Sequence, residues 1–175
     1  MEALYFLVDT VLVFVVYAFL LRVLLQVVRA DFRNPLAQAV VALTNWLVLP
    51  LRRVLPPVGR VDTASLVALL VVQFAATLIQ FQLRTGAQFP FVPLAAAALR
   101  SLALATLMLY TILIFVYAAL SFIAPGVHSP AASMLASLCE PVLQPLRRIL
   151  PVVGGIDFSP LVAIVGLTAL RILIS

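Results

Sequence analysis

The residues with the clearest chemical pattern are arginine pairs that precede an aspartate, and this pattern occurs twice. The residues are Arg52, Arg53 and Asp62 in the first copy, and Arg147, Arg148 and Asp157 in the second, at one offset of 95 residues. Guanidinium groups bind phosphate headgroups or carboxylates through planar, bidentate hydrogen bonds. Each aspartate therefore has two interpretations. It caps the following helix and complements its dipole, or it also holds an arginine of the preceding pair.

Prolines and glycines recur in the same register as these charges. The shared backbone positions are Pro35, Pro50, Pro56 and Gly59, and Pro130, Pro145, Pro151 and Gly154. Residues of this kind constrain the backbone directly, so a shared register predicts a shared path rather than only a shared hydrophobicity. We therefore predict two copies of one unit, residues 1–84 and 99–175, joined by a linker at 85–98.

The composition indicates an integral membrane protein. Of the 175 residues, 65% are hydrophobic and 10% are charged, and the mean hydropathy is +1.24. A water-soluble domain carries about 25% charged residues, so this chain cannot cover a globule with polar groups. The length predicts an all-α fold with four transmembrane helices in two parallel tandem repeats. The expected spans are Leu4–Arg29, Ala64–Leu83, Leu99–Ile123 and Leu161–Ile174.

Between the two spans of each repeat lies a shorter apolar segment that carries one polar stripe. In the first copy the segment without proline, Leu36–Leu49, would form about 21 Å of helix, which is too short to cross a bilayer of about 30 Å. Helical spacing aligns Asn34, Gln38, Asn45 and Arg52 here, and Ser133, Ser137, Glu140, Gln144 and Arg147 in the second copy. The pattern predicts an amphipathic helix, either interfacial or re-entrant. The alternative is a longer, proline-kinked span. At the next helix starts, Asp62 or Thr63 is expected to cap the first and Ser159 the second.

Among the polar residues inside the expected spans, Asp9, Arg22 and Gln73 are the candidates for a role within the membrane. We expect Arg22 to reach the inner membrane surface, because an arginine at the bilayer centre costs roughly 2.5–3.5 kcal/mol even on the milder scale. Asp9 is either a wetted interfacial carboxylate or a functional one. Gln73 is expected to hydrogen-bond to another helix or, alternatively, to line a polar pathway.

The distribution of arginine in the loops predicts the orientation. The loops inside the repeats carry seven arginines, and the loop between the repeats carries two, Arg84 and Arg100. The positive-inside rule therefore places the repeated Arg-Arg loops in the cytoplasm and both termini outside. Because each repeat contains an even number of spans, the two copies would be related by an axis along the membrane normal.

The sequence motifs of the common enzyme classes are missing from the chain. Cys139 and His128 are the only cysteine and histidine, so we expect no disulfide, no metal site and no cofactor. No nucleotide-binding loop, nucleophile elbow or zinc-protease motif occurs. The sequence thus predicts a protein that is not an enzyme. The isoelectric point near 10.4 favours anionic lipid over nucleic acid, because the basic residues lie beside the spans.

The segments LLRVLLQ, DFRNPLAQ, PLRRVLPPVGRVD and PLRRILPVVGGIDFSP resemble the YggT (YlmG-related) family, in its two-repeat proteobacterial form. The resemblance covers nearly the whole chain. It implies a multi-pass protein of the bacterial inner membrane that is associated with osmotic stress tolerance and cation homeostasis. It brings no catalytic residues with it.

Two functions are consistent with these features. The first is a membrane scaffold or assembly factor, whose arginine pairs bind anionic lipid or the juxtamembrane segment of an unidentified membrane-protein partner. The alternative is a channel-like or transport-modulating protein for cations. A homo-oligomer would have to supply the pore, since four spans in one chain enclose none.

Overall fold

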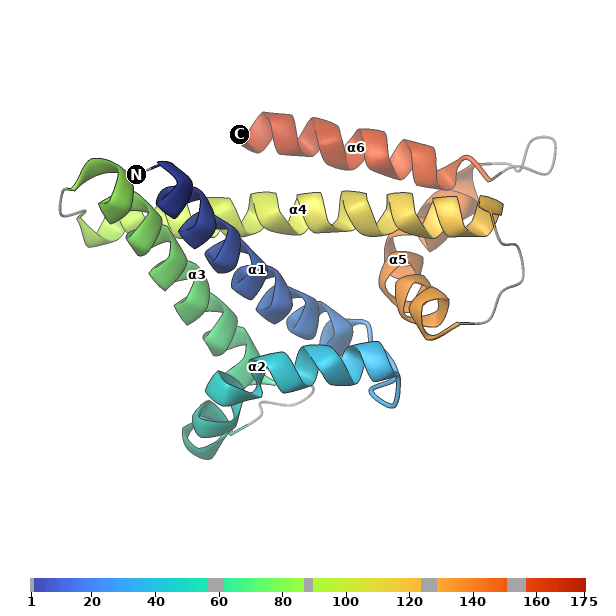
Figure 1. Ribbon diagram of the computed structural model, residues 1–175. Coiled ribbons are helices and arrows are strands. Elements are labelled where there is room, and N and C mark those ends of the chain that lie inside the picture. The colour runs from blue at the N-terminus through green and yellow to red at the C-terminus, as the bar shows by residue number, and fades with distance from the viewer. Residues whose placement is uncertain (1, 57–61, 87–89, 124–128, 151–156) are drawn as a thin grey trace. The chain divides into compact units, whose positions relative to one another are not determined.

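The computed structural model describes residues 2–56, 62–86, 90–123, 129–150 and 157–175, and within them it contains six α-helices and no β-strand (Figure 1). The helices are α1 (Glu2–Val27), α2 (Pro35–Val54), α3 (Thr63–Thr85), α4 (Phe91–Ile123), α5 (Pro130–Ile149) and α6 (Ser159–Ile174). The predicted all-α class is confirmed.

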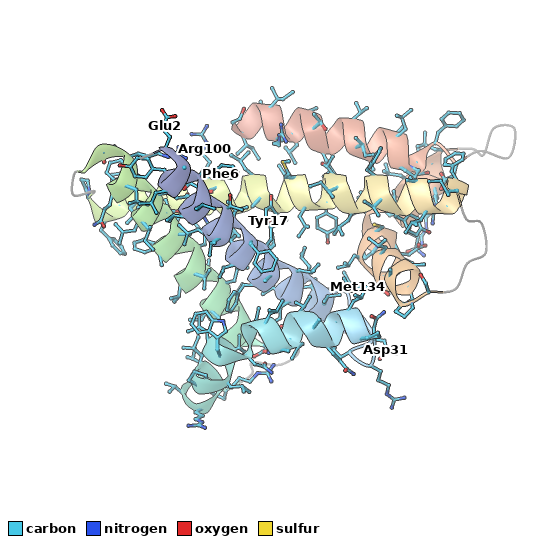
Figure 2. The ribbon with its side chains drawn as sticks, in the orientation of Figure 1. Glu2, Phe6, Tyr17, Asp31, Arg100 and Met134 are labelled. Carbon is cyan, nitrogen blue, oxygen red and sulfur yellow. The ribbon has the colours of Figure 1, made fainter. Side chains whose placement is uncertain are left out.

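Three of these helices, α1, α3 and α4, are long and apolar enough to cross a membrane, with mean hydropathies of 2.4, 2.0 and 2.2. Their outward surfaces are apolar: Phe6 and Phe14 of α1 and Phe115 of α4 are all at least 60% exposed. Figure 2 shows such side chains projecting along the helices. Exposed apolar surface of this extent indicates contact with lipid. Helix α6 is also apolar, but with 16 residues it is shorter than a crossing requires.

Helix α4 begins earlier than predicted. We expected the third span to start at Leu99, whereas α4 starts at Phe91 and has 33 residues. Pro93 falls in its first turn, where the missing N–H of proline removes no intrahelical hydrogen bond. Proline at this position is compatible with the helix, so the third candidate span begins before Leu99.

Helices α2 and α5 continue through their internal prolines. The expected break of α2 at Pro50 does not occur, and α5 likewise contains Pro141 and Pro145. A proline inside a helix removes one hydrogen bond and displaces the carbonyl four residues before it, so it bends a helix more readily than it ends one. Figure 1 shows the ribbon of α2 changing direction toward its C-terminal end. Neither helix reaches the apolar character of the three candidate spans.

The chain divides into two compact units, residues 1–26 with 39–103 and residues 27–38 with 104–175. Buried residues of the first unit include Phe19, Leu25 and Val48. In the second unit, Ile114, Cys139, Leu143 and Ala163 form a hydrophobic core cluster. The division passes inside α2 and α4, so it differs from the repeat boundaries, which stay a prediction from the sequence.

Candidate functional site

The first candidate site is centred on Arg22, which is 1% exposed. Its Nε atom donates a hydrogen bond to Ser65 Oγ of α3 at 3.1 Å. Its Nη1 atom lies 2.7 Å from Thr44 Oγ1, 2.9 Å from Asn45 Oδ1 and 3.2 Å from the Val41 carbonyl oxygen, all on α2. One guanidinium therefore joins α1, α2 and α3.

The burial of Arg22 corrects our expectation that it would reach the membrane surface. A buried guanidinium is tolerated where its N–H groups are hydrogen-bonded, and α2 and α3 supply those acceptors. Thr44 and Ser65 are fully buried polar residues. Sequence reasoning did not identify either of them as a partner of Arg22. Their signal in the sequence was weak, because single hydroxyl residues are common in apolar helices.

Asp62 lies immediately before α3 and connects this cluster to the arginine pair. Its Oδ2 atom accepts hydrogen bonds from Ser65 Oγ at 2.7 Å, Gln26 Nε2 at 3.2 Å and Arg52 Nε at 3.1 Å, and it also forms a salt bridge with Arg52. The carboxylate makes no capping hydrogen bond to the helix backbone. Of the two interpretations of Asp62, the geometry therefore shows the one in which it holds an arginine.

These hydrogen bonds change the acidity of Asp62. Partial burial alone would raise the pKa of the carboxyl, but hydrogen bonds from Arg52 and Ser65 outweigh it and lower the pKa to about 2. The carboxylate is thus charged at neutral pH, and it balances one of two nearby guanidinium groups, those of Arg22 and Arg52.

The second copy builds a related cluster with different chemistry. Arg147 Nε donates to Asp157 Oδ2 at 2.8 Å, and Arg147 Nη1 lies 3.2 Å from Glu140 Oε2. Asp157 Oδ1 also accepts the backbone N–H of Ser159 at 2.9 Å, so Asp157 fulfils both predicted roles. Burial would raise the pKa of Asp157, but the hydrogen bonds from Ser159 and Arg147 lower it.

The expectation that Ser159 caps α6 was wrong, because α6 begins at Ser159.

The two clusters carry opposite excess charge. At the offset of 95, Arg22 corresponds to Tyr117 and Asn45 corresponds to Glu140. The first cluster therefore has two guanidinium groups and one carboxylate, and the second has one guanidinium group and two carboxylates. The buried arginine of the first copy has no counterpart in the second. Any functional two-fold symmetry between the copies is limited by this difference.

The second arginine of each pair has a different environment from the first. Arg53 and Arg148 are exposed, and neither makes an ion pair with any residue that the structure describes. Arg52 and Arg147, in contrast, hold Asp62 and Asp157. Within each Arg-Arg pair, the first side chain thus forms an ion pair within the fold, and the second forms none with the residues that the structure describes.

The two remaining intramembrane residues have local partners. Arg84 Nη2 lies 2.8 Å from Asp9 Oδ2, joining the start of α1 to the end of α3, with side-chain exposures of 70% and 26%. Gln73 is buried, and its amide donates to Thr77 Oγ1 one turn further along the same helix, at 3.1 Å. This contact lies within α3 rather than between helices.

Asp9→Asn should lower stability only slightly, by about 0.5 kcal/mol, because an ion pair whose arginine is this exposed is screened by solvent. Chemical denaturation of the purified protein in detergent would measure the difference. A loss of more than about 2 kcal/mol would contradict a solvent-screened, interfacial ion pair.

Of the repeated backbone residues, Pro50 and Pro145 lie inside the amphipathic helices, and others lie at or beyond their ends. Pro35 and Pro130 are the first residues of α2 and α5, the position that proline favours. The carbonyl oxygen of Pro56 accepts a hydrogen bond from Thr63 Oγ1 at 2.8 Å. Four sequence-predicted positions lie outside the described residues: Gly59, Pro151, Gly154 and His128.

Cys139 is buried in the core cluster of the second unit. Burial, and next the neighbouring Glu140 carboxylate, raise the pKa of its thiol to about 12, so the thiol is protonated at neutral pH. Within the described ranges, no group of three or more His, Cys, Asp and Glu side chains is placed to hold a metal ion.

Comparison with known proteins gives one consistent family. A family model described as CCB3/YggT matches residues 1–83 and 96–175. The chain is 36% identical to Uncharacterized protein YggT of Escherichia coli K12 over 164 residues, which is 94% of this chain and 85% of that protein. It is 34% identical to an uncharacterised protein of Vibrio alginolyticus over 95% of this chain and 90% of that protein. No solved structure matches.

Proposed function

The chain belongs to the CCB3/YggT family, and from this premise we propose that it is a non-enzymatic scaffold or assembly factor of the bacterial inner membrane. Its cytoplasmic face would hold anionic lipid headgroups and the juxtamembrane segment of a membrane-protein partner. By this binding it would contribute to osmotic stress tolerance and cation homeostasis. The names of the relatives state no activity, so the proposal depends on the chemistry of the site.

The proposed topology has four spans in two parallel repeats, with both termini outside. Helices α1, α3 and α4 supply three spans, and α6 would supply the fourth, thinning the bilayer locally because it is short. The arginine count supports a cytoplasmic position for the repeated loops. This topology puts Arg53 and Arg148 on the same side, facing the leaflet in which anionic lipids attract basic residues.

The observation that carries the proposal is the division within each arginine pair. Arg52 and Arg147 are held by Asp62 and Asp157, whereas Arg53 and Arg148 are exposed and form no ion pair with the residues that the structure describes. An arginine near a membrane surface contributes about 1 kcal/mol of attraction to anionic lipid. Two such arginines give a reversible preference, which suits a scaffold that exchanges its partners.

The test is lipid selectivity, measured by electron paramagnetic resonance of spin-labelled phosphatidylglycerol and phosphatidylcholine in proteoliposomes. The parent protein should associate with phosphatidylglycerol more strongly than with phosphatidylcholine. The double variant Arg53→Gln with Arg148→Gln should lose most of that preference, because each arginine contributes a factor of about five to the relative association constant. The matched control, Arg52→Gln with Arg147→Gln, removes the same charge one residue earlier. It should keep the preference and lose thermal stability.

Equal selectivity in the parent and the Arg53/Arg148 variant would reject headgroup binding by these residues. Ion flux from the same liposomes under an osmotic step separates the other function. Selective, saturable flux that the variant alters would replace the scaffold proposal with a cation-transport one.

A further inference from the structure

Helix α2 has three longitudinal faces, and one of them is both apolar and exposed. Ala37, Val40, Thr44 and Val48 form the buried face. Asn45 and Arg52 lie on the polar stripe, whose members bond to Arg22 and Asp62. The remaining face exposes Leu43, Trp46 and Leu49, with Trp46 64% exposed. A helix in water would place polar residues there.

Helix α5 is polar at the corresponding face. In the register of the repeat, Trp46 corresponds to Pro141, Leu49 to Gln144 and Arg53 to Arg148, and all six positions are exposed. Leu138, which corresponds to Leu43, is fully buried in α5. The two helices share the register of the repeat, but the exposed face of α2 carries Leu43, Trp46 and Leu49, whereas the exposed face of α5 carries Pro141 and Gln144.

We propose that the two amphipathic helices have different surroundings: α2 lies in the membrane with Leu43, Trp46 and Leu49 among the acyl chains, whereas Pro141 and Gln144 on the outer face of α5 lie in water. The occupant of the exposed face of α2 is thus lipid. This inference deepens the proposed scaffold function and depends on its membrane placement. It leaves α5 as the helix on which Pro141 and Gln144 face the aqueous side, before Arg148 reaches the headgroups.

Two observations favour lipid over a protein partner on α2. Trp46 packs edge-to-face on Phe19 of α1, with ring centroids 6.0 Å apart, and Phe19 is itself buried, so the exposed indole lies directly against a candidate spanning helix. Arg53 lies two helical turns after Trp46 on the same face and has no ion pair in the described chain. Tryptophan and arginine at one face of an amphipathic helix match the headgroup level of a bilayer, where the indole is buried and the guanidinium reaches phosphate.

The experiment uses the full-length protein in vesicles of neutral phosphatidylcholine. Trp46 is the only tryptophan, so its fluorescence reports on α2 alone. Quenching by dibrominated acyl chains measures contact with lipid, and quenching by iodide measures contact with water. The matched variant, Trp46→Phe with Pro141→Trp, moves the indole to the corresponding position of α5.

For Trp46 we expect brominated lipid to remove most of the emission and iodide to remove little. For the moved indole we expect the reverse, together with a red-shifted emission maximum. If circular dichroism shows that the Pro141 variant does not fold, Trp46→Phe with Gln144→Trp makes the same comparison at the position of Leu49. Similar quenching of the two indoles by brominated lipid would overturn the asymmetry.

Two other results would overturn the lipid assignment. Iodide quenching of Trp46 without quenching by brominated lipid would place the face of α2 in water. Protection of Trp46 from both quenchers would mean that protein, either a second copy or a partner, covers it. Because the vesicles contain no anionic lipid, these outcomes do not depend on headgroup binding by Arg53 and Arg148. Failure of the inference is therefore distinguishable from failure of the proposed function.

Discussion

Replacement of Arg22 by methionine should destabilise the protein by about 3 kcal/mol, because the acceptors around the buried guanidinium lose their donor. Methionine keeps an unbranched chain of comparable length, so the variant leaves little cavity. The Asn45 amide oxygen would be left without this hydrogen bond, and α2 would lose its polar attachment to α1. Thermal and chemical unfolding of the purified protein in detergent would measure the loss.

Trp46 reports separately on the attachment of α2. Its ring packs against Phe19 of α1, so detachment of α2 in the Arg22→Met variant should shift the tryptophan emission before the spans unfold. Arg22→Lys should be intermediate, because one ammonium group cannot reach acceptors on both α2 and α3 as a planar fork does.

Arg53→Met is the matched control for this prediction. It removes the same charge from an exposed site, and its effect should stay within about 0.5 kcal/mol. If Arg22→Met were as mild as Arg53→Met, the cluster would not hold the three helices together. The candidate site would then reduce to the Arg52–Asp62 pair.

The sequence predicts the repeat from residues that constrain the backbone. The repeat organisation stays a prediction, but two of its local consequences appear in the structure. Pro35 and Pro130 begin α2 and α5, and Arg52 and Arg147 reach the matched aspartates. Spacing alone also predicted the polar stripe of α2. Its members Asn45 and Arg52 both face groups of the first cluster. Periodicity predicts which residues share a face of a helix, and this prediction does not depend on how the helix packs in the folded protein.

The surroundings of Arg22 were not predictable in the same way. Burial of an arginine depends on acceptors that are distant in the sequence, here Thr44 and Ser65, and no local pattern marks them. For a related reason, the sequence favoured a break of α2 at Pro50, whereas α2 and α5 continue through their internal prolines. Packing along the whole buried face offsets the lost hydrogen bonds, and packing is a tertiary property.

Asp62→Asn is the second change with a large expected effect, a loss of roughly 2 kcal/mol at neutral pH. Asparagine retains the shape of the aspartate side chain, but it removes the negative charge that lies near Arg52 and Arg22. Its NH₂ group cannot accept the hydrogen bonds that Arg52, Gln26 and Ser65 donate to the carboxylate. The lowered pKa of the Asp62 carboxyl, about 2 against an ordinary 3.8, corresponds to about that free energy. Urea unfolding followed by circular dichroism would measure it.

The pH dependence of this contribution has a definite sign. Because the pKa is lower in the folded protein than in the unfolded chain, the stabilisation by Asp62 is complete above about pH 4 and is lost as the pH falls toward 2. The parent should therefore lose stability in that window, and Asp62→Asn should lose correspondingly less. Parallel pH profiles for the two proteins would mean that the Asp62 carboxylate does not stabilise the fold.

Asp157→Asn tests whether the two copies differ as their charges suggest. Arg147 would keep Glu140 as a partner at 3.2 Å, whereas Arg52 in the Asp62 variant would have no carboxylate partner among the described residues. Asp157 is also the more exposed carboxylate, with a side-chain exposure of 34% against 16%. We therefore expect Asp157→Asn to lower the free energy of unfolding by less than about 1 kcal/mol.

Double-mutant cycles compare the coupling energy of Arg52 with Asp62 to that of Arg147 with Asp157, and the coupling energy should be larger in the first copy. Equal couplings would mean that Glu140 contributes nothing, and the opposite charges of the two clusters would then have no consequence for stability.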